Sequence, residues 1–220
     1  MQIPDFKNQA LLITALTHRS ALNEQNSSSP ESNERFEFLG DAVLELATTR
    51  YLFERFPDTQ EGLLTAYRSA LVKTETLAKV ARELGLGQKL LMSKGEEATG
   101  GRDNDSLLAD TMEAVIGGLY LDQGFETVEQ FLAAVLFIEF EEILKLKLYK
   151  DSKSHLQEVV QAEGRETPVY KVVSEVGPDH DKVFTVNVLV GSEVLATGTG
   201  SSKQRAQQAA AQNALEKKLD

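Results

Sequence analysis

The chain has 220 residues, of which 41% are hydrophobic and 26% are charged, and its formal net charge is −11. This composition is that of an ordinary globular protein, and the length suffices for one large domain or two small ones, each with its own core. No run of 18 apolar residues occurs, so we expect no membrane span. The N-terminal residues also lack the basic and apolar regions of a signal peptide.

The absence of cysteine excludes several kinds of functional site. It excludes disulfides, thiolate metal sites and cysteine nucleophiles, and it fits a reducing compartment, so we expect a cytoplasmic location. With three histidines in the chain, a histidine-rich metal site is not expected. A bound metal would therefore sit on oxygen ligands, which Mg²⁺, Mn²⁺ and Ca²⁺ prefer.

The negative charge is unevenly distributed. Residues 1–150 carry 15 basic and 24 acidic side chains, whereas residues 151–220 carry 8 and 10. A net acidic chain argues against nucleic-acid binding, which usually requires a basic surface. Because the acidic excess lies in the first part, this argument is weaker for the second part.

Before residue 150 the patterns are helical, and no segment there is a strand candidate. Asn33 is a suitable N-cap for one helix, which has to end by Pro57, and Gly85 is a suitable stop for another. Polar loops are expected at 23–32 and 93–104. Helical periodicity predicts helices over residues 8–22, 33–56, 59–72, 74–85, 105–124 and 127–148.

After residue 150 helical and strand patterns mix. In residues 183–190 apolar side chains alternate with others, and Gly191-Ser192 supplies a tight hairpin turn. The predicted order is α-β-β-β-α, with helices over 153–164 and 201–219 and strands over 168–176, 183–190 and 193–200. The fold class is therefore α+β overall, with an all-α domain at 1–147, a short charged linker at 148–152 and an α-β-β-β-α domain at 153–220.

One face of the helix predicted at 33–56 gathers four carboxylates. Glu34, Glu37, Asp41 and Glu45 fall within an arc of about 80° at about 100° per residue. Apolar residues lie on the opposite side, namely Phe36, Leu39, Val43, Leu46 and Phe53. This helix alone favours a solvated acidic face. Against this interpretation, like charges at Glu37 and Asp41 repel by roughly a few tenths of a kcal/mol.

A second acidic pair changes the interpretation. Asp110 and Glu113 lie one turn apart in an apolar helix, beside Ala114 and Gly117, whose small size lets another helix approach. Such acids are expected to be partly buried, without an obvious set of basic partners nearby, and therefore to need a cation or a proton. If Glu37 and Asp41 face this pair, the four carboxylates form an oxygen cage that suits Mg²⁺.

A metal in such a cage could activate water and stabilise charge on a phosphate, so the arrangement favours phosphodiester hydrolysis. An oxidative di-iron bundle also uses acids on facing helices. That class requires a Glu-x-x-His motif, which this sequence does not contain.

The motif "NERFEFLGDAVL" at residues 33–44 resembles the signature of the ribonuclease III nuclease domain. "ALTHRS" before it, and "EGLLTAYRSALV" and "KGEEATGG…LLADTMEAVIGGLYLD" after it, extend the match. The α-β-β-β-α segment with "GTGSSKQRAQQAAAQNAL" resembles the double-stranded-RNA-binding domain that follows the nuclease in the bacterial enzyme. The resemblance covers nearly the whole chain.

This resemblance implies a helical nuclease that works as a homodimer with two active sites. Glu37, Asp41, Asp110 and Glu113 match the Mg²⁺-binding catalytic acids, and Mn²⁺ is expected to substitute. Among them, Asp41 and Glu113 match the two most closely tied to hydrolysis. Glu34 and Glu61 match acidic positions nearer the RNA and the dimer junction, and form a second rank of site residues. Glu45 is outside the pattern and is interpreted as a surface acid.

Phe38 matches the aromatic residue that inserts into a socket on the partner subunit. Its position off the apolar side of the helix is unusual for a core residue, although a flanking core position remains an alternative.

The resemblance also implies the reaction. Metal-activated water cleaves each strand, leaving 5′-phosphate and 3′-hydroxyl ends with short 3′ overhangs, because two sites related by a twofold axis each meet one strand. The expected substrates are ribosomal precursor and other structured RNAs. The alternative is a non-cleaving RNA-binding or chaperone protein with the same fold.

Double-stranded RNA is recognised mostly by shape, through 2′-hydroxyls and phosphates. By resemblance, the RNA-binding residues are Gln157 and Glu158 on the first helix, His180 in a loop, and Ser202 and Lys203 at the start of the last helix. Without this context, His180 would be interpreted as a solvated loop residue. Gln204 departs from the pattern, which usually has adjacent lysines, so we expect weaker RNA binding in salt than for more basic relatives.

Overall fold

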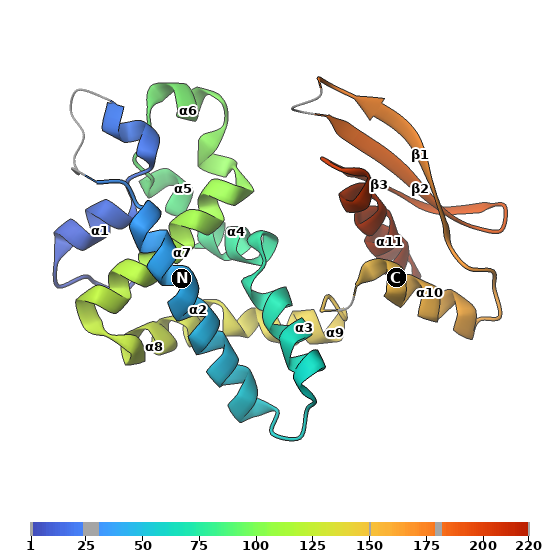
Figure 1. The fold of residues 1–220 in the computed structure, drawn as a ribbon, viewed down its shortest axis with the longest axis horizontal. Coiled ribbons are helices and arrows are strands. Elements are labelled where there is room, and N and C mark those ends of the chain that lie inside the picture. The colour runs from blue at the N-terminus through green and yellow to red at the C-terminus, as the bar shows by residue number, and fades with distance from the viewer. Residues whose placement is uncertain (1, 24–30, 150, 179–181, 220) are drawn as a thin grey trace. The chain divides into compact units, whose positions relative to one another are not determined.

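The chain forms two compact units, residues 1–149 and 150–220, each with its own hydrophobic core. The computed structural model describes residues 2–23, 31–149, 151–178 and 182–219 (Figure 1). No helix in these ranges is both long and apolar enough to cross a membrane.

All regular secondary structure among the described residues of the first unit is helical, as the periodicity predicts, apart from one isolated bridge between Thr17 and Leu91. Three short 3₁₀ helices interrupt the α-helices, at Arg19–Asn23, Gly101–Asp103 and Phe137–Glu139. The α-helices are α1 (Gln9–Ala15), α2 (Glu34–Arg55), α3 (Glu61–Val72), α4 (Thr74–Glu83), α5 (Leu86–Lys89), α6 (Lys94–Ala98), α7 (Asp105–Gln123), α8 (Phe125–Val135) and α9 (Phe140–Lys145).

The centre of this unit is the close packing of α2 against α7 (Figure 1). Two glycines make this approach possible. A Cβ atom on Gly40 would lie 1.8 Å from the carbonyl oxygen of Glu113, and a Cβ atom on Gly117 would lie 2.2 Å from the carbonyl oxygen of Phe36. Neither distance permits a side chain, so the two backbones meet only because both positions are glycine.

The helix predicted at 8–22 is broken, so that prediction is wrong. α1 ends at Ala15, and the carbonyl of Leu16 and the amide of His18 instead bond the backbone of Leu91 at 2.8 and 2.9 Å. Thr17 is fully buried, and its hydroxyl donates to the carbonyl of Ile13 at 2.6 Å. This tertiary pairing competes with the helical hydrogen bonds.

The helix predicted at 127–148 is also interrupted, by the 3₁₀ turn between α8 and α9. This turn brings the ring of Phe137 into a stack on Tyr51 at 4.1 Å and the ring of Phe140 to 5.2 Å from Tyr67. The gain from aromatic packing explains the break.

The predicted loop at 93–104 contains α6 and a 3₁₀ turn. Ser93 caps α6, since its hydroxyl accepts a hydrogen bond from the amide of Glu96 at 3.2 Å. The Ser-x-x-Glu spacing at 93–96 is the sequence signal for this helix start.

Helix α2 starts where the sequence predicts, but Asn33 makes no side-chain cap. Asn33 is buried instead, and its amide donates to the carbonyl of Thr17 at 2.8 Å. The residue before α2 is thereby hydrogen-bonded to the segment that follows α1.

The second unit has the predicted order: α10 (Ser152–Ala162), β1 (Val169–Val176), β2 (Val183–Val190), β3 (Glu193–Gly200) and α11 (Lys203–Leu219). The strands form one antiparallel sheet in the order β1-β2-β3. Both helices pack on one face of the sheet, against Val186, Val188 and Val190. Gly198 allows the close approach of α11, because a Cβ there would lie 2.1 Å from the amide of Ala210.

Several residues of the segment predicted as a linker belong to the units themselves. Leu148 and Tyr149 pack against the core of the first unit, and Tyr149 makes an edge contact with Tyr67 at 4.7 Å. Asp151 caps α10 by accepting from the amide of Ser154 at 2.9 Å.

Candidate active site

Three carboxylates from α2 and α7 converge on one point. One oxygen each from Glu37, Asp110 and Glu113 lies within 4.8 Å of the others, and all three side chains are half-buried. The contact between Gly40 and the backbone at Glu113 brings them together, because it holds the two helices at a distance that no larger residue allows. We refer to these three residues as the acidic cluster.

The acidic cluster concentrates negative charge in a partly dry environment. Burial, followed by the charges of Asp41 and Asp110, raises the pKa of Glu113 from its ordinary 4.5 to about 8. Burial and the neighbouring charge of Asp110 also raise the pKa of Glu37, and burial raises that of Asp110. A divalent cation would relieve this repulsion, and an all-oxygen ligand set suits a hard ion such as Mg²⁺ or Mn²⁺.

Asp41, the fourth predicted acid, lies one turn beyond Glu37 on α2 and is exposed, outside the acidic cluster. Its charge nevertheless raises the pKa of both Glu37 and Glu113, so it borders the same site.

Two basic side chains from the segment after α1 influence these acids. The guanidinium of Arg19 lies 3.6 Å from the carboxylate of Glu34, and its charge lowers the pKa of Glu37. Burial raises the pKa of Asp110, and an electrostatic contribution from His18 partly offsets this rise. Both residues lie in the "ALTHRS" motif, so the resemblance already marked this segment. Helical periodicity alone could not predict that the segment lies beside the acids.

The remaining acids have separate roles. Glu34 is exposed and accepts a hydrogen bond from the hydroxyl of Ser32 at 2.8 Å. Glu45 pairs with Arg68 at 2.8 Å between α2 and α3, so it is a partly exposed acid in an ion pair. Glu61 begins α3 and accepts from the hydroxyl of Thr65 at 3.2 Å.

Three large apolar side chains of α2, those of Phe38, Leu46 and Phe53, are exposed, and we refer to them as the apolar stripe. Phe38 is 82% exposed, which excludes the core alternative, and Leu46 and Phe53 are 59% and 70% exposed. Leu46 and Phe53 lie on the apolar side of the predicted helix, yet the first unit does not bury them. Within the first unit, the core takes Val43 and Leu44 from this helix and leaves the stripe uncovered.

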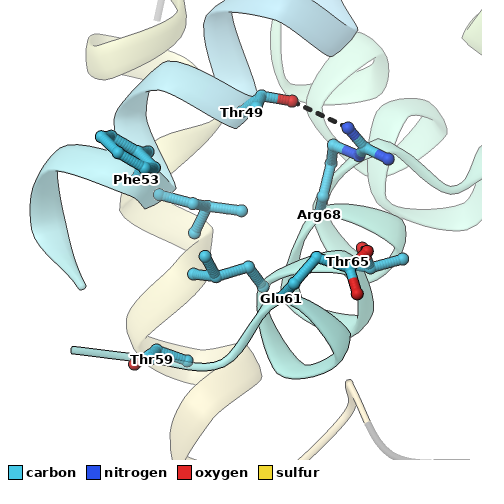
Figure 2. Close-up of a pocket in the computed structure, with 8 residues that line it drawn as sticks. Thr49, Phe53, Thr59, Glu61, Thr65 and Arg68 are labelled. Atoms are coloured by element: carbon cyan, nitrogen blue, oxygen red, sulfur yellow. Dashed lines mark hydrogen bonds between the residues drawn. The ribbon is translucent and has the colours of Figure 1, made fainter. Parts of the chain in front are cut away.

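Of these side chains, that of Phe53 lines a cleft of about 380 Å³ between α2 and α3 (Figure 2). In Figure 2, Phe53 lies on the α2 side and Glu61 on the α3 side, while Arg68 donates to the hydroxyl of Thr49 at 2.9 Å. The cleft therefore combines apolar walls with fixed charged groups.

In the second unit, Gln157 and Glu158 are exposed on α10, the first helix of this unit. Ser202 and Lys203 lie at the start of α11, where the Ser202 hydroxyl accepts from the amide of Arg205 at 3.2 Å. The ammonium of Lys203 pairs with Glu175 at 2.9 Å.

Gln204 and His180 are two further residues of this unit that stand out in the sequence. Gln204 and Gln157 both line a groove of about 420 Å³. His180 lies outside the described residues.

The glutamines further along α11 pack against the start of α10. Lys153 donates to Gln207 at 2.8 Å, and Ser152 donates to Gln212 at 3.0 Å. Gln208 donates to the carboxylate of Asp151. These side chains join the two helices.

Comparison with known proteins agrees with both units. A family model described as Ribonuclease-III-like matches residues 8–139, and one described as Double-stranded RNA binding motif matches residues 152–218. The chain belongs to the ribonuclease III family. It is accordingly an endoribonuclease, with a helical nuclease domain followed by an α-β-β-β-α double-stranded-RNA-binding domain.

Curated relatives support the assignment over nearly the full length. Proteins named Ribonuclease 3 from Roseiflexus sp. (strain RS-1) and Anoxybacillus flavithermus are 49% and 50% identical over 213 and 212 residues. These matches cover 96% of this chain, and 90% and 89% of the relatives. The solved nuclease domain of ribonuclease III from Campylobacter jejuni is 43% identical with a TM-score of 0.56, covering 62% of this chain and 88% of that one.

Proposed function

We propose that the protein is a Mg²⁺-dependent endonuclease for double-stranded RNA, in which Mn²⁺ can substitute for Mg²⁺. The observation that supports the metal most strongly is the acidic cluster, where three carboxylates meet within 4.8 Å and the pKa of Glu113 is about 8. Such a site favours a cation over three mutually repelling charges.

The residues of the site have distinct roles in this proposal. Glu37, Asp110 and Glu113 hold the metal, and Asp41 borders them from the exposed side of α2. A bound Mg²⁺ supplies water of lowered pKa and stabilises the charge that develops on the phosphate. In the metal-free protein at neutral pH the Glu113 carboxyl holds a proton, which it loses when the cation binds. Asp41 and Glu113 are assigned the roles closest to hydrolysis.

We further propose that the enzyme acts as a homodimer, with the apolar stripe of α2 at the junction. A phenylalanine that is 82% exposed is costly to leave in water, and Leu46 and Phe53 on the same helix are exposed as well. The Campylobacter jejuni nuclease domain has a region described as involved in dimer formation. In the proposed dimer Phe38 enters the partner protomer's α2–α3 cleft, and Glu34 and Glu61 lie near the junction.

Two sites related by a twofold axis would each cut one strand. The expected products carry 5′-phosphate and 3′-hydroxyl ends with short 3′ overhangs. The proposed substrates are ribosomal precursor and other structured RNAs in the cytoplasm.

In the proposed division of labour, residues 1–147 cut, 148–152 connect and 153–220 bind RNA. The groups assigned to RNA are Gln157, Glu158, His180, Ser202 and Lys203. The N-terminus of α11 supports this assignment, because a helix N-terminus favours phosphate.

The decisive test is incubation of the full chain with a long RNA duplex in Mg²⁺, with EDTA as the control. Cleavage in Mg²⁺ alone, followed by mapping of the ends on a defined hairpin, supports the proposal. Intact duplex from a folded protein in Mg²⁺ would favour the alternative of a non-cleaving RNA-binding protein.

A further inference from the structure

One exposed face of α2 carries a cation beside the apolar stripe. At about 100° per residue, Arg35 falls about 60° from Phe38 around the helix and in line with Phe53. All three side chains are exposed. Arg35 therefore belongs to the same face of the helix as the apolar stripe, about one turn from Phe38 on the N-terminal side.

Arg35 has no partner inside its own protomer. In the part of the chain that the structure describes, it forms no hydrogen bond, ion pair or ring contact. The other arginines of α2 are both paired. Arg50 binds Glu54 at 2.9 Å, and Arg55 binds Glu141. A cation in the first turn of a helix is also disfavoured by the helix dipole, so neither the helix nor the first unit explains the position of Arg35.

The α2–α3 cleft offers a carboxylate that is unpaired as well. Glu61 begins α3, is exposed and lines this cleft. It accepts a hydrogen bond from the neutral hydroxyl of Thr65 at 3.2 Å, and none of the described cations forms an ion pair with it. Arg68, which also lines the cleft, is already bound to Glu45 at 2.8 Å and to Thr49 at 2.9 Å. The cleft therefore presents a negative charge that is available to a partner.

The proposed position of Phe38 in the partner's cleft determines how the two α2 helices run. The α2 wall of the cleft is formed by Thr49, Leu52 and Phe53. These residues lie more than 10 positions beyond Phe38, which corresponds to more than about 15 Å along the helix. Parallel helices related by a twofold axis would place each Phe38 beside its own copy. The two α2 helices therefore run antiparallel in the proposed dimer.

This direction brings Arg35 to one particular end of the cleft. Arg35 precedes Phe38 by about one turn, so it lies about one turn closer to the C-terminal end of the partner's α2. At that end the chain turns back into α3, whose first residue is Glu61. Figure 2 shows Glu61 next to the loop that joins α2 and α3, away from the hydrogen bond between Thr49 and Arg68. Arg35 and the carboxylate of the opposite protomer therefore reach the same place.

We propose that Arg35 of each protomer forms an ion pair with Glu61 of the partner subunit, beside the cleft that receives Phe38. The inference rests on the proposed function, because that proposal supplies the homodimer. Residues 1–150 carry 15 basic and 24 acidic side chains, so the net charges of two protomers repel each other. Two ion pairs between otherwise unpaired charges offset part of this repulsion and favour the antiparallel register over others.

Charge reversal on both sides of the junction tests the pair. The dimer dissociation constants of wild type, Arg35→Glu, Glu61→Arg and the double variant are measured by sedimentation velocity on the full chain, in EDTA and without RNA. We expect each single variant to raise the constant about 10-fold or more, because both attractions of the dimer become repulsions. The double variant restores opposite charges and should recover most of the lost affinity.

Two charge reversals elsewhere in the first unit serve as controls. Glu83→Arg on α4 and Lys89→Glu on α5 change exposed residues outside α2 and α3, and should leave the dissociation constant near its wild-type value. Thermal unfolding verifies that all variants are folded. Equal constants for Arg35→Glu and wild type, or a double variant that dimerises no better than the single ones, would overturn the inference.

Cross-linking tests the same contact without charge reversal. The chain has no cysteine, so one can be introduced at each position. Arg35→Cys and Glu61→Cys chains are co-expressed and treated with a short bismaleimide. We expect a covalent dimer from the pair but not from either chain alone, because antiparallel helices separate the two copies of each position. No covalent dimer from a pair that sediments as a dimer would overturn the inference.

These outcomes separate the inference from the proposed function. A dimeric wild type whose affinity is unchanged in Arg35→Glu defeats the inference alone. A wild type that stays monomeric at all concentrations defeats both the proposed homodimer and the ion pair. A dimer that the double variant restores, from a protein that leaves duplex RNA intact in Mg²⁺, supports the inference and defeats the proposed nuclease activity.

Discussion

Gly40 of α2 lies against the backbone carbonyl of Glu113 on α7, so closely that a Cβ at Gly40 would come within 1.8 Å of this oxygen. The backbone of Glu113 thus forms part of the contact between the two helices, while its side chain belongs to the acidic cluster. Separation of the two helices would therefore both weaken the core and pull the carboxylates apart.

We predict that Gly40→Ala destabilises the protein by about 3 kcal/mol or more, because the added methyl group meets backbone and cannot be accommodated by a rotamer change. The same variant should lose Mn²⁺ affinity. Urea unfolding and metal titration measure the two effects. Gly62→Ala on α3 is the matched control, since a Cβ there has nothing within 4 Å, and it should stabilise the helix by roughly 0.5 to 1 kcal/mol.

The raised pKa of Glu113 predicts how the stability of the metal-free protein depends on pH. Between the ordinary value of 4.5 and about 8, the folded chain holds a proton on Glu113 that the unfolded chain releases. The unfolded state then binds fewer protons, so the contribution of Glu113 to stability is present below pH 4.5 and is lost as the pH rises through 8.

Thermal unfolding in EDTA from pH 5 to 9 measures this effect. We expect Glu113→Gln to flatten the decline, since the amide stays neutral throughout the range. Saturating Mg²⁺ is the control, because a bound cation stabilises the ionised carboxylate and should oppose the decline. An identical slope for Glu113→Gln and wild type in EDTA would contradict the assignment.

We predict that Glu113→Gln also abolishes cleavage of duplex RNA while leaving RNA binding largely intact. The amide keeps the size of the side chain but removes the negative charge that a metal requires. Cleavage assays and gel-shift binding in Ca²⁺ distinguish the two properties, with Glu83→Gln, an exposed residue of α4, as the control. Loss of RNA binding together with cleavage would make Glu113 a structural residue.

The sequence predicts those parts of the fold that depend on local patterns. The alternation in residues 183–190 locates β2 with its full bounds, because Val186, Val188 and Val190 all face one core. The helical period likewise locates α2 and α7. The break at Leu16–His18 has no such signal, because the competing hydrogen bonds come from Leu91, more than 70 residues away.

In the candidate site, too, local patterns predict some features, while others depend on tertiary contacts. Small residues beside Asp110 and Glu113 correctly predict that a second helix approaches, and Gly117 is one of the two contact points. Periodicity shows that Leu46 and Phe53 are apolar, but it cannot distinguish a face that meets the core of the same chain from one that meets a second protein. The basic residues near the acids, His18 and Arg19, come from a separate segment, whose position depends on tertiary hydrogen bonds.

Phe38→Ala should weaken dimerisation without reducing the stability of the single protomer. The side chain is 82% exposed, so its removal leaves no cavity in the first unit. An aromatic residue that fills a socket in a partner is typically worth about 2 kcal/mol or more, which corresponds to roughly a 30-fold rise in the dimer dissociation constant. Sedimentation velocity over a concentration series measures this change.

Leu121→Ala is the matched control for Phe38→Ala, because Leu121 is an apolar residue of α7 that is also exposed, at 50%. We expect this variant to dimerise like wild type. Equal sedimentation of Phe38→Ala and Leu121→Ala would remove Phe38 from the proposed junction.

Gln204→Lys should strengthen RNA binding and make it more sensitive to salt. Gln204 is exposed near the N-terminus of α11, next to Lys203, and it shares a groove with Gln157. An added lysine that contacts a phosphate releases about one more counterion, so the slope of log affinity against log salt should steepen by about 1.

Gln212→Lys is the control, because it makes the same charge change on the same helix, at a side chain that bonds Ser152 and Glu216. It should leave the slope near its wild-type value. A salt titration with a duplex RNA, in Ca²⁺ to prevent cleavage, compares the three proteins. Unchanged affinity of Gln204→Lys at every salt concentration would show that the missing lysine does not limit RNA binding in this chain.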